Sequence, residues 1–568
     1  MSPESSTPVI RRRFVKVAAR RVHYLRAGAG PPAVLVHSSP ANARILLPEI
    51  AWLSRSHTCF AFDTPGFGLS DALPLAHMEV TDLADALADT LRTVGLPPCP
   101  VFGSHTGAAV TLELAARHPH RVTGIVLDGL PIFTEDECAT LFSGGYFRPM
   151  PIDPLGGHFA SAWTRFRDQS IWFPWFDQRP DNLNPYDLSP PARTHAWLMM
   201  YFYAAGTYMP AYRAALAYGE RALVAVAALT TRAVFTATET DMLHPHLGRL
   251  PTLKPGQEIR GIGTSIERKH LLIAESFVSF GSAGMAPADP HEIVSSAMVE
   301  RQFVDAPHGS IHVRHAGDRS LPPMLLLHDA PGSAQFLEPL IAALSARYFV
   351  CAPDLPGCGE SDPLPGDAPA MADYVAAMMA LCASAGLSRP LVYGIGFGSS
   401  LAIALAAHAS TTAYGLVLRG VLMPDGAENA ILRREYAPPI VIEPDGSHWY
   451  RTWLMLRDAQ IYWPWCDRRQ QALRRVPADF GAEHMHAWTF EVMKQHASYQ
   501  HLIQAAIGYD AGAALAAVAG PVLICNDAST PLSVYDHRLE ALLPNAPRCE
   551  ATDDVAHTHT IAEYIGGT

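Results

Sequence analysis

Features that would assign a chain to a membrane-spanning, secreted or nucleic-acid-binding class are missing from these 568 residues. No stretch approaches the roughly 20 consecutive apolar residues of a membrane-spanning helix. The polar start lacks the charged-then-apolar layout of a secretory signal. The formal net charge is −12, and the sequence contains no basic run or stripe. Both features disfavour nucleic-acid binding. We therefore expect a protein that binds neither membranes nor nucleic acid.

Cysteine is sparse, and its spacing indicates no disulfide framework. The nine cysteines are scattered along the chain without a CxxC pair. Such a set in apolar surroundings is typical of buried free thiols in a reducing compartment, so we expect a cytoplasmic protein. With 49% apolar and 17% charged residues, the composition is that of a globular protein. The length is too great for one hydrophobic core and predicts several domains.

One turn organises the sequence around it. Residues 99–110 read CPVFGSHTGAAV, so a short apolar run meets a turn flanked by Gly103 and Gly107 and passes into a helical pattern. Small residues are needed there because the backbones of strand and helix approach closely. The pattern resembles the nucleophile elbow of the α/β-hydrolase family, in which the central residue is a serine. Here the central residue is His105.

The pattern occurs twice. The loop DTPGFGLSD at 63–71 returns as DLPGCGESD at 354–362, and the elbow at 103–107 returns as GIGFG at 394–398, both at an offset of 291 residues. Short aliphatic runs alternate with helical patterns in each half, which is typical of a mostly parallel sheet covered on both faces. We predict an α/β fold class: two tandem α/β-hydrolase folds, each a mostly parallel sheet flanked by helices.

Each half also carries a long helical, aromatic-rich stretch between its sixth and seventh predicted strands. The resemblance implies a lid, at about 130–230 in a first domain at 10–280 and at about 423–517 in a second domain at 301–568, with a linker at 281–300. Side chains recur between the two lids, and we expect them mainly to fold the lid and in part to line a pocket for apolar or aromatic substrates. Prominent pairs are His158/His448, Arg167/Arg457, Asp168/Asp458, Trp175/Trp465, Asp177/Asp467, Arg179/Arg469 and His195/His486.

The resemblance implies positions for catalytic residues in the first half. In this family the nucleophile, acid and histidine follow strands five, seven (sometimes six) and eight. His105 occupies the elbow, Asp241 follows the seventh predicted strand, and His270 is expected before the last helix, with Asp128 after the sixth strand as a reserve acid. An Asp–His pair is useful because the carboxylate fixes the tautomer and stabilises the imidazolium.

The role of His105 is open at this level. It is a candidate nucleophile, a candidate general acid–base, or a residue that lines a binding pocket. Together with His270 and Asp241 it also forms a two-His-one-carboxylate set, but the resembled family uses no cofactor, so we expect neither metal nor cofactor. The family's oxyanion hole implies the backbone N–H groups of Thr106 and of Ser38 or Ser39, which suits acyl or carbonyl substrates.

The second half keeps fewer of these groups. Its elbow apex is Gly396, its acid position falls near Thr530 with Asp527 out of step, and His557 and His559 lie near the last histidine position. We expect this half to be a non-catalytic partner that docks on the first half within the chain, with further homo-oligomerisation left open.

These observations favour a cofactor-independent hydrolase-type enzyme that acts on an ester, a thioester or a carbon–carbon bond next to a carbonyl of a small molecule. The alternatives are a non-catalytic pseudo-hydrolase that binds a small apolar or aromatic ligand, and a lyase or cofactor-free oxygenase on the same fold.

Overall fold

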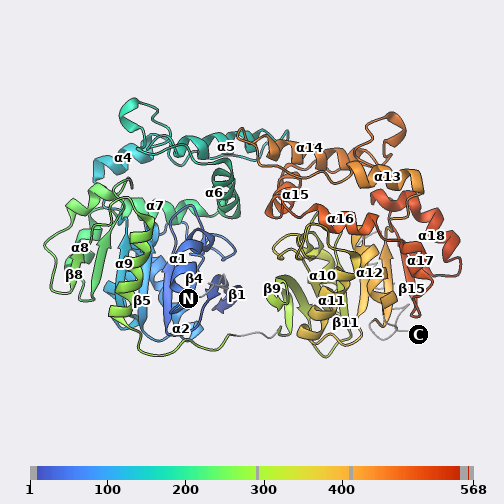
Figure 1. The fold of residues 1–568 in the computed structure, drawn as a ribbon, viewed down its shortest axis with the longest axis horizontal. Coiled ribbons are helices and arrows are strands. Elements are labelled where there is room, and N and C mark those ends of the chain that lie inside the picture. The colour runs from blue at the N-terminus through green and yellow to red at the C-terminus, as the bar shows by residue number, and fades with distance from the viewer. Residues whose placement is uncertain (1–8, 290–292, 409–412, 551–560, 562–568) are drawn as a thin grey trace, which may run out of the picture. The chain divides into compact units, whose positions relative to one another are not determined.

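The computed structural model describes residues 9–289, 293–408, 413–550 and 561. The chain divides into two compact units, one of residues 1–150 and 161–289 and the other of residues 151–160 and 290–568. The described strands form two eight-stranded sheets, in the orders β1-β2-β4-β3-β5-β6-β7-β8 and β9-β10-β12-β11-β13-β14-β15-β16 (Figure 1). The two sheets therefore have the same strand order.

The elements of the first half alternate strands with helices. The strands are β1 (Ile10–Val17), β2 (Arg20–Ala27), β3 (Pro32–Val36), β4 (Thr58–Phe62), β5 (Cys99–Ser104), β6 (Val122–Asp128), β7 (Ala233–Thr236) and β8 (Gln257–Ile259). The helices are α1 (Leu47–Leu53), α2 (Val80–Val94), α3 (Thr106–Arg117), α4 (Glu135–Ser143), α5 (Gly157–Gln169), α6 (Pro191–Ala204), α7 (Tyr208–Tyr218), α8 (Arg221–Ala228) and α9 (Ile266–Phe280).

The second half follows the same alternation. Its strands are β9 (Ser296–Ala306), β10 (Gly309–Gly317), β11 (Pro323–Leu327), β12 (Phe349–Pro353), β13 (Leu391–Ile395), β14 (Gly415–Arg419), β15 (Val522–Asn526) and β16 (Arg548–Glu550). Its helices are α10 (Glu338–Leu344), α11 (Met371–Ala385), α12 (Phe397–His408), α13 (Gly426–Glu435), α14 (Ser447–Ile461), α15 (Ala482–Lys494), α16 (Gln500–Ile507), α17 (Ala511–Leu515) and α18 (Asp536–Leu542).

The sheets are mostly parallel because, from the third strand of each half onward, helical segments return the chain over a face of the sheet between successive strands. The first two strands form an antiparallel hairpin, with Phe14 opposite His23, and β2 pairs antiparallel with β4. From β4 onward the pairs are parallel. Strands β3 and β4 are buried along their whole length, as expected where both faces are covered. The predicted fold class is confirmed.

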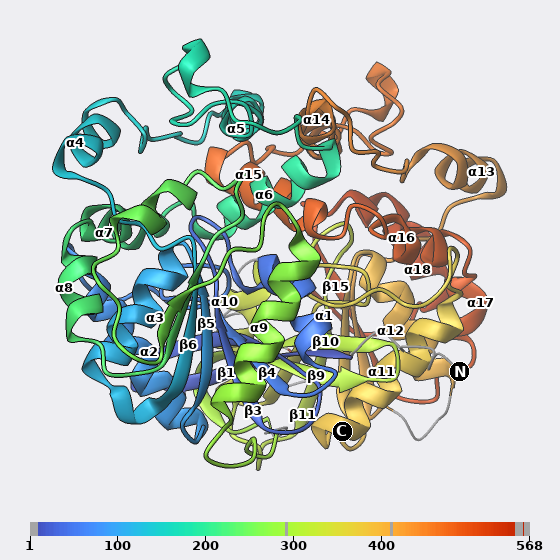
Figure 2. The same ribbon diagram turned by 60° about the vertical axis from the view of Figure 1, so that its left-hand side comes forward.

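Helices cover both faces of the first sheet. On one face α1 packs against α9, and on the other α3 packs against α2 and α8 (Figure 2). A continuous apolar core lies under α1 and α9, and it includes Leu25, Leu35, Leu46, Ile50, Phe102, Val126, Leu272 and Phe277. This rigid layer fixes the end of β5, where the elbow begins.

Helical segments lie between the sixth and seventh strands of each half, from α4 to α8 and from α13 to α17. In the first half the Thr207 hydroxyl donates to the carbonyl of Gly66 at 2.6 Å, which ties the α6–α7 turn to the loop after β4. In the second half the Gln495 amide donates to the carbonyls of Gly359 and Ser361 at 3.2 and 2.9 Å. These segments thus cover the loops at the carboxyl ends of the strands.

The predicted linker differs from the structure at its end. Strand β9 begins at Ser296, so the last residues of the expected 281–300 linker belong to the second sheet. Asp289 is held to the first hairpin by two hydrogen bonds from Arg13, at 3.0 and 2.8 Å. Among the described residues, no helix is long and apolar enough to cross a membrane.

Candidate active site

The turn between β5 and α3 places His105 at its apex. Its backbone has φ 49° and ψ −111°, a strained conformation for a residue with a side chain. The N–H of His105 donates to the carbonyl of Asp128 at 2.9 Å, which fixes the turn to the end of β6. A Cβ on Gly103 would lie 2.2 Å from the carbonyl oxygen of Gly107. The close approach inferred from the sequence is therefore present.

The imidazole of His105 is bound by a carboxylate. Its Nε2 lies 2.8 Å from Oδ2 of Asp241, and the two side chains are 33% and 18% exposed. Because an ionised carboxylate only accepts hydrogen bonds, Nε2 carries the proton in the neutral ring and Nδ1 has the lone pair. Among the described residues no group bonds to Nδ1. The ring packs against Gly129, where a Cβ would stand 2.6 Å from its Cδ2.

The loop after β7 presents Asp241. The N–H of Leu243 donates to Oδ1 of Asp241 at 2.8 Å, which leaves Oδ2 for His105. Burial raises the pKa of Asp241, but the charge and hydrogen bond of His105 outweigh burial and lower that pKa to about 2. Burial lowers the pKa of His105, but Asp241, and more weakly Asp128, outweigh it, so this pKa lies above its ordinary value. The pair therefore favours a carboxylate beside a basic imidazole.

His270 does not join this pair in the structure. The expectation that it precedes the last helix is wrong, because it lies inside α9. Its Nε2 is 3.7 Å from Oε1 of Glu49, beyond hydrogen-bond distance, and its ring centroid is 5.7 Å from that of Trp52. The acid expected to orient His270, Asp241, bonds to His105 instead.

A buried group of charged side chains lies beside the dyad formed by His105 and Asp241. Lys269 Nζ is 3.0 Å from Oε1 of Glu49 and 3.4 Å from Oδ2 of Asp128. The reserve acid Asp128 thus contacts a lysine. Burial, with repulsion from Asp241 and Glu49, raises the pKa of Asp128 despite Lys269 and His105. Glu49 and Lys269 were missed from the sequence, because nothing in the spacing links α1 to α9.

The expected oxyanion donors lie next to the elbow. Thr106 is the first residue of α3, and Ser38 and Ser39 follow β3, all three buried. His37 holds this loop, because its Nδ1 contacts the carbonyl of Ser38 at 2.8 Å and its Nε2 accepts from the N–H of Thr64 at 2.9 Å. In the described part of the chain, no side chain accepts a hydrogen bond from the N–H of Thr106 or of Ser39. The N–H groups of Thr106 and Ser39 therefore stay candidates for the oxyanion donors.

The second half fills the corresponding place with its own side chain. Oδ1 of Asp329 accepts from the N–H of Phe397 at 2.7 Å and from the N–H of Ala330 at 2.8 Å. At the offset of 291 residues, these donors match Thr106 and Ser39, and Asp329 matches Ser38. Sequence reasoning missed Asp329, although alignment of the two loops after the third strand would have found it.

The other second-half positions also lack the first half's groups. Arg419 stands at the position of Asp128, and its Nε donates to Oδ2 of Asp527 at 2.7 Å. Thr530 begins a short helix, with its hydroxyl accepting from the N–H of Leu532. His557 and His559 lie outside the described residues. Ile561, fully buried, stands at the offset position of His270.

The repeated residues of the inserted helices make largely local contacts. The indole Nε1 of Trp175 donates to the carbonyl of Tyr146 at 3.2 Å, and that of Trp465 to the carbonyl of Tyr436 at 2.7 Å. Ion pairs follow the same stretches, at Arg167–Asp168, Arg179–Asp177, Arg468–Asp458 and Arg469–Asp467. These contacts stabilise the inserted helices.

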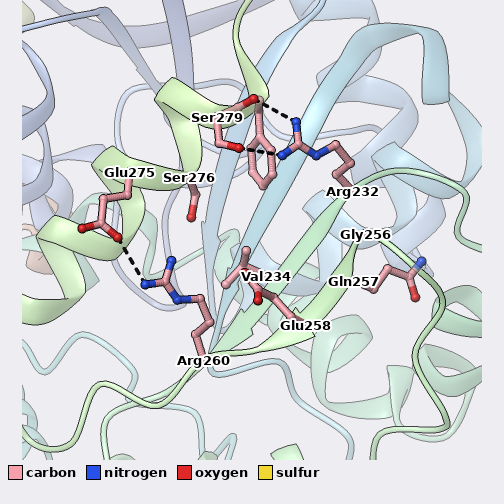
Figure 3. A pocket seen from close by; sticks show the side chains of 10 residues that line it. Arg232, Val234, Gly256, Gln257, Glu258, Arg260, Glu275, Ser276 and Ser279 are labelled. Carbon is pink, nitrogen blue, oxygen red and sulfur yellow. Dashed lines mark hydrogen bonds and ion pairs between the residues drawn. The ribbon is translucent and has the colours of Figure 1, made fainter.

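Two cavities differ in their position and in the groups that line them. One of about 470 Å³ lies where β7 and β8 meet α9, away from His105. Both arginines that line it are paired, since Arg232 donates to Ser279 and Arg260 to Glu275 at 3.2 Å (Figure 3). The other, about 380 Å³, lies in the second half and is lined by Asp329 and aromatic side chains. In the part of the chain that the structure describes, no three potential metal ligands group together.

A family model described as the alpha/beta hydrolase fold matches residues 31–148 and 322–436, one segment in each half. A curated relative, (E)-2-((N-methylformamido)methylene)succinate hydrolase of Acinetobacter baylyi, is 30% identical over 112 residues, 20% of this chain and 42% of that protein. Another, 2-hydroxy-6-oxo-2,4-heptadienoate hydrolase of Pseudomonas putida, is 38% identical over 108 residues, 18% of this chain and 38% of that protein.

Among solved structures, that of E-2-(acetamidomethylene)succinate hydrolase covers 48% of this chain and 99% of its own, at 19% identity and a TM-score of 0.36. The chain spans less than half the length of the curated relatives it matches. The family match in both halves supports the α/β-hydrolase superfamily, and the curated relatives that match part of the chain are hydrolases.

Proposed function

On the premise that both halves have an α/β-hydrolase fold, we propose that the first half is a cofactor-independent hydrolase whose reacting group is Nδ1 of His105. The observation that carries the proposal is the 2.8 Å contact between His105 Nε2 and Asp241. It holds a histidine at the place of the usual serine with its other nitrogen available. A pocket-lining histidine needs neither a strained backbone nor a dedicated carboxylate.

The dyad acts as a general base on water in this proposal. Nδ1 takes a proton from a water molecule, and the oxygen attacks the carbonyl carbon of the substrate. Asp241 stabilises the imidazolium that forms. When the bond to the leaving group breaks, the same Nδ1 returns the proton to that group, so the dyad ends each cycle unchanged. A nucleophilic role would instead place the acyl group on Nδ1 as an acyl-imidazole before hydrolysis.

The backbone N–H groups of Thr106 and Ser39 support the oxyanion of the intermediate in this mechanism. Two such donors stabilise developing negative charge without regard to the side chains that follow them. Lys269 contacts Glu49 and Asp128, and these carboxylates balance its charge. It keeps the region under the elbow close to neutral.

The substrate class follows from the carbonyl chemistry. An ester, a thioester or a carbon–carbon bond next to a carbonyl each passes through an oxyanion that these donors fit. Two curated relatives are named as hydrolases of carboxylate-containing substrates, a methylene succinate and an oxo-heptadienoate. We propose a small apolar or aromatic acyl compound, and we propose that the second half does not catalyse this reaction.

The test is turnover of p-nitrophenyl acetate and p-nitrophenyl butyrate by the full chain. His105→Ala and Asp241→Asn should each lower kcat/KM by about 100- to 10,000-fold, the usual range for a lost general base. The matched control is His118→Ala, since His118 Nε2 lies 2.7 Å from Oδ1 of Asp85 outside the site. That variant should keep wild-type turnover.

Intact-mass measurement during turnover separates the two roles of His105. A general base leaves the protein mass unchanged, whereas an acyl-imidazole adds the acyl group. Accumulation of acyl-protein that His105→Ala abolishes would replace the base mechanism with a nucleophilic one. Absence of turnover for every ester, thioester and β-diketone tried would favour the binding protein or the lyase and oxygenase alternatives.

A further inference from the structure

The cavity of the second half has an anionic floor and aromatic walls. Asp329 lies at the end of β11, and the walls come from the inserted helices and the loops around them. The aromatic side chains that line it are Phe336, Tyr436, Trp465, Trp488 and Tyr499. Its volume of about 380 Å³ lies in the range of small-molecule sites.

Asp329 has one oxygen engaged and one available. Oδ1 accepts both backbone N–H groups, from Phe397 and Ala330. Oδ2 accepts no hydrogen bond from any residue that the structure describes, and Asp329 is part-exposed to the cavity. Burial raises the pKa of Asp329 to about 6, although the N–H groups of Phe397 and Ala330 and, more weakly, the charge of Arg419 act in the opposite direction. Filling this cavity with an uncharged apolar ligand would leave the carboxylate without a partner, which is costly.

The cation in the cavity wall does not compensate this charge. The guanidinium of Arg474 donates to the backbone carbonyls of Ala459 and Gln460 at 3.3 and 3.4 Å, and also to that of Ser529. Arg419 pairs with Asp527. Among the other polar groups that line the cavity, the indole of Trp488 donates to the carbonyl of Pro331 at 2.6 Å. The charge of Asp329 is therefore open to a ligand.

An anionic substrate or an acyl oxyanion does not fit this site. The two N–H groups that would bind an oxyanion are occupied by Asp329, and the carboxylate repels a second negative charge. A cation suits it for two reasons. Its ammonium group can donate to Oδ2 as a charge-assisted hydrogen bond, and aromatic faces attract cations within about 6 Å of the ring.

We propose that the second half is a binding site for a small aromatic amine, with Oδ2 of Asp329 holding the ammonium group and the aromatic walls holding the ring. The same change that removes the oxyanion hole supplies the ligand anchor. The site is independent of the His105 dyad, so it stands or falls apart from the hydrolase proposal.

The test uses three probes of similar shape on the full chain: 2-phenylethylamine, 2-phenylethanol and 3-phenylpropionate, followed by titration calorimetry. The amine should bind at least about tenfold more tightly than the alcohol, as one charge-assisted hydrogen bond predicts, and the carboxylate should not bind in the second half. Equal binding of all three probes, tighter binding of the carboxylate, or no binding of the amine would overturn the proposal.

Two variants assign the binding to this cavity. Asp329→Asn keeps an oxygen for the two N–H groups but removes the charge, so amine affinity should fall about tenfold or more while the alcohol is unaffected. Ala459→Phe leaves Asp329 intact and fills the cavity, and it should abolish amine binding. Asp318→Asn is the matched control, because Asp318 is exposed and its carboxylate accepts hydrogen bonds from Ser320. Circular dichroism melting establishes that each variant folds, and amine binding unchanged in both cavity variants would contradict the proposal.

Discussion

The carboxylate of Asp329 occupies the space that a side chain on Gly396 would need. A Cβ built on Gly396 would stand 2.0 Å from Cγ and Oδ1 of Asp329. The backbone of Gly396, at φ 58°, is close to that of His105 at φ 49°. Because a residue with a side chain adopts this backbone in the first half, the steric conflict with Asp329, rather than the dihedral alone, requires glycine in the second.

This conflict predicts a strong coupling between the two positions. Gly396→Ala should destabilise the protein by about 2–4 kcal/mol, because the new methyl group displaces Asp329 from its two hydrogen bonds. In an Asp329→Ala background the same substitution should cost about 1 kcal/mol, the backbone strain alone. Urea denaturation of the single and double variants measures the coupling. Additive effects would show that the two residues do not conflict in solution.

The same conflict bears on attempts to restore catalysis in the second half. Gly396→Ser should create no ester turnover. The acid near Thr530 would still be missing, and the carboxylate of Asp329 would still lie next to the N–H groups of the oxyanion site. The measurement is p-nitrophenyl acetate hydrolysis in a His105→Ala background, where the first half is silent. Turnover gained there would contradict a non-catalytic second half.

The pH dependence of turnover tests the dyad. Only the neutral imidazole of His105 acts as a base, so kcat/KM should rise with pH and level off above the pKa of His105. That pKa lies above its ordinary value, about 6.5. In Asp241→Asn the carboxylate charge is gone, and burial, which lowers the pKa, dominates. The midpoint should then move to lower pH, while His118→Ala leaves it in place.

The contribution of His105 to stability should fall as pH rises, whereas kcat/KM rises. A raised folded pKa contributes stability that is present below the unfolded pKa and is lost as pH rises through the folded value. Asp241, with a folded pKa of about 2, contributes above its unfolded pKa and loses this contribution as pH falls toward 2. The pair should therefore stabilise most between about pH 4 and 6.5. The gap between the urea midpoints of wild type and His105→Ala should narrow as pH rises through the folded pKa of His105, and a constant gap up to pH 9 would contradict the pairing.

Removing Lys269 tests the buried charges under the elbow. Lys269→Met leaves the buried carboxylates of Glu49 and Asp128 without their cation, which should cost about 3–5 kcal/mol. The deficit should narrow as pH falls, because protonation of Asp128 relieves the repulsion. Arg92→Met removes one partner of the exposed Arg92–Asp89 pair and should cost less than about 1 kcal/mol. Equal effects of the two variants would mean that the buried group contributes no more than a surface pair.

His270→Ala separates the family's usual assignment from the observed geometry. With His270 beside Trp52 and Glu49, we expect a lower melting temperature but kcat/KM within about threefold of wild type, since no general base is lost. The pH midpoint should stay unchanged. A loss as large as that of His105→Ala would return His270 to the catalytic set.

The sequence alone determined the fold class and the location of the elbow. Strands such as β3 are continuous apolar runs because both faces of the sheet are covered, and that pattern is local and readable. The glycines at 103 and 107 are likewise dictated by the close approach of strand and helix. The offset of 291 residues assigned the second half the same order of elements, which the two strand orders match.

Only the tertiary structure decided which side chains meet. Asp241 and His270 were both assigned by their order along the chain, yet the loop after β7 turns Asp241 toward the elbow while α9 carries His270 to Glu49. Alignment of the two halves places Asp329 opposite Ser38, but it does not show which N–H groups the Asp329 carboxylate binds. Its partners lie on the next residue and on a helix 68 residues away, and a hydrogen bond between such distant segments depends on how parallel strands are ordered in the sheet, which a local pattern does not encode.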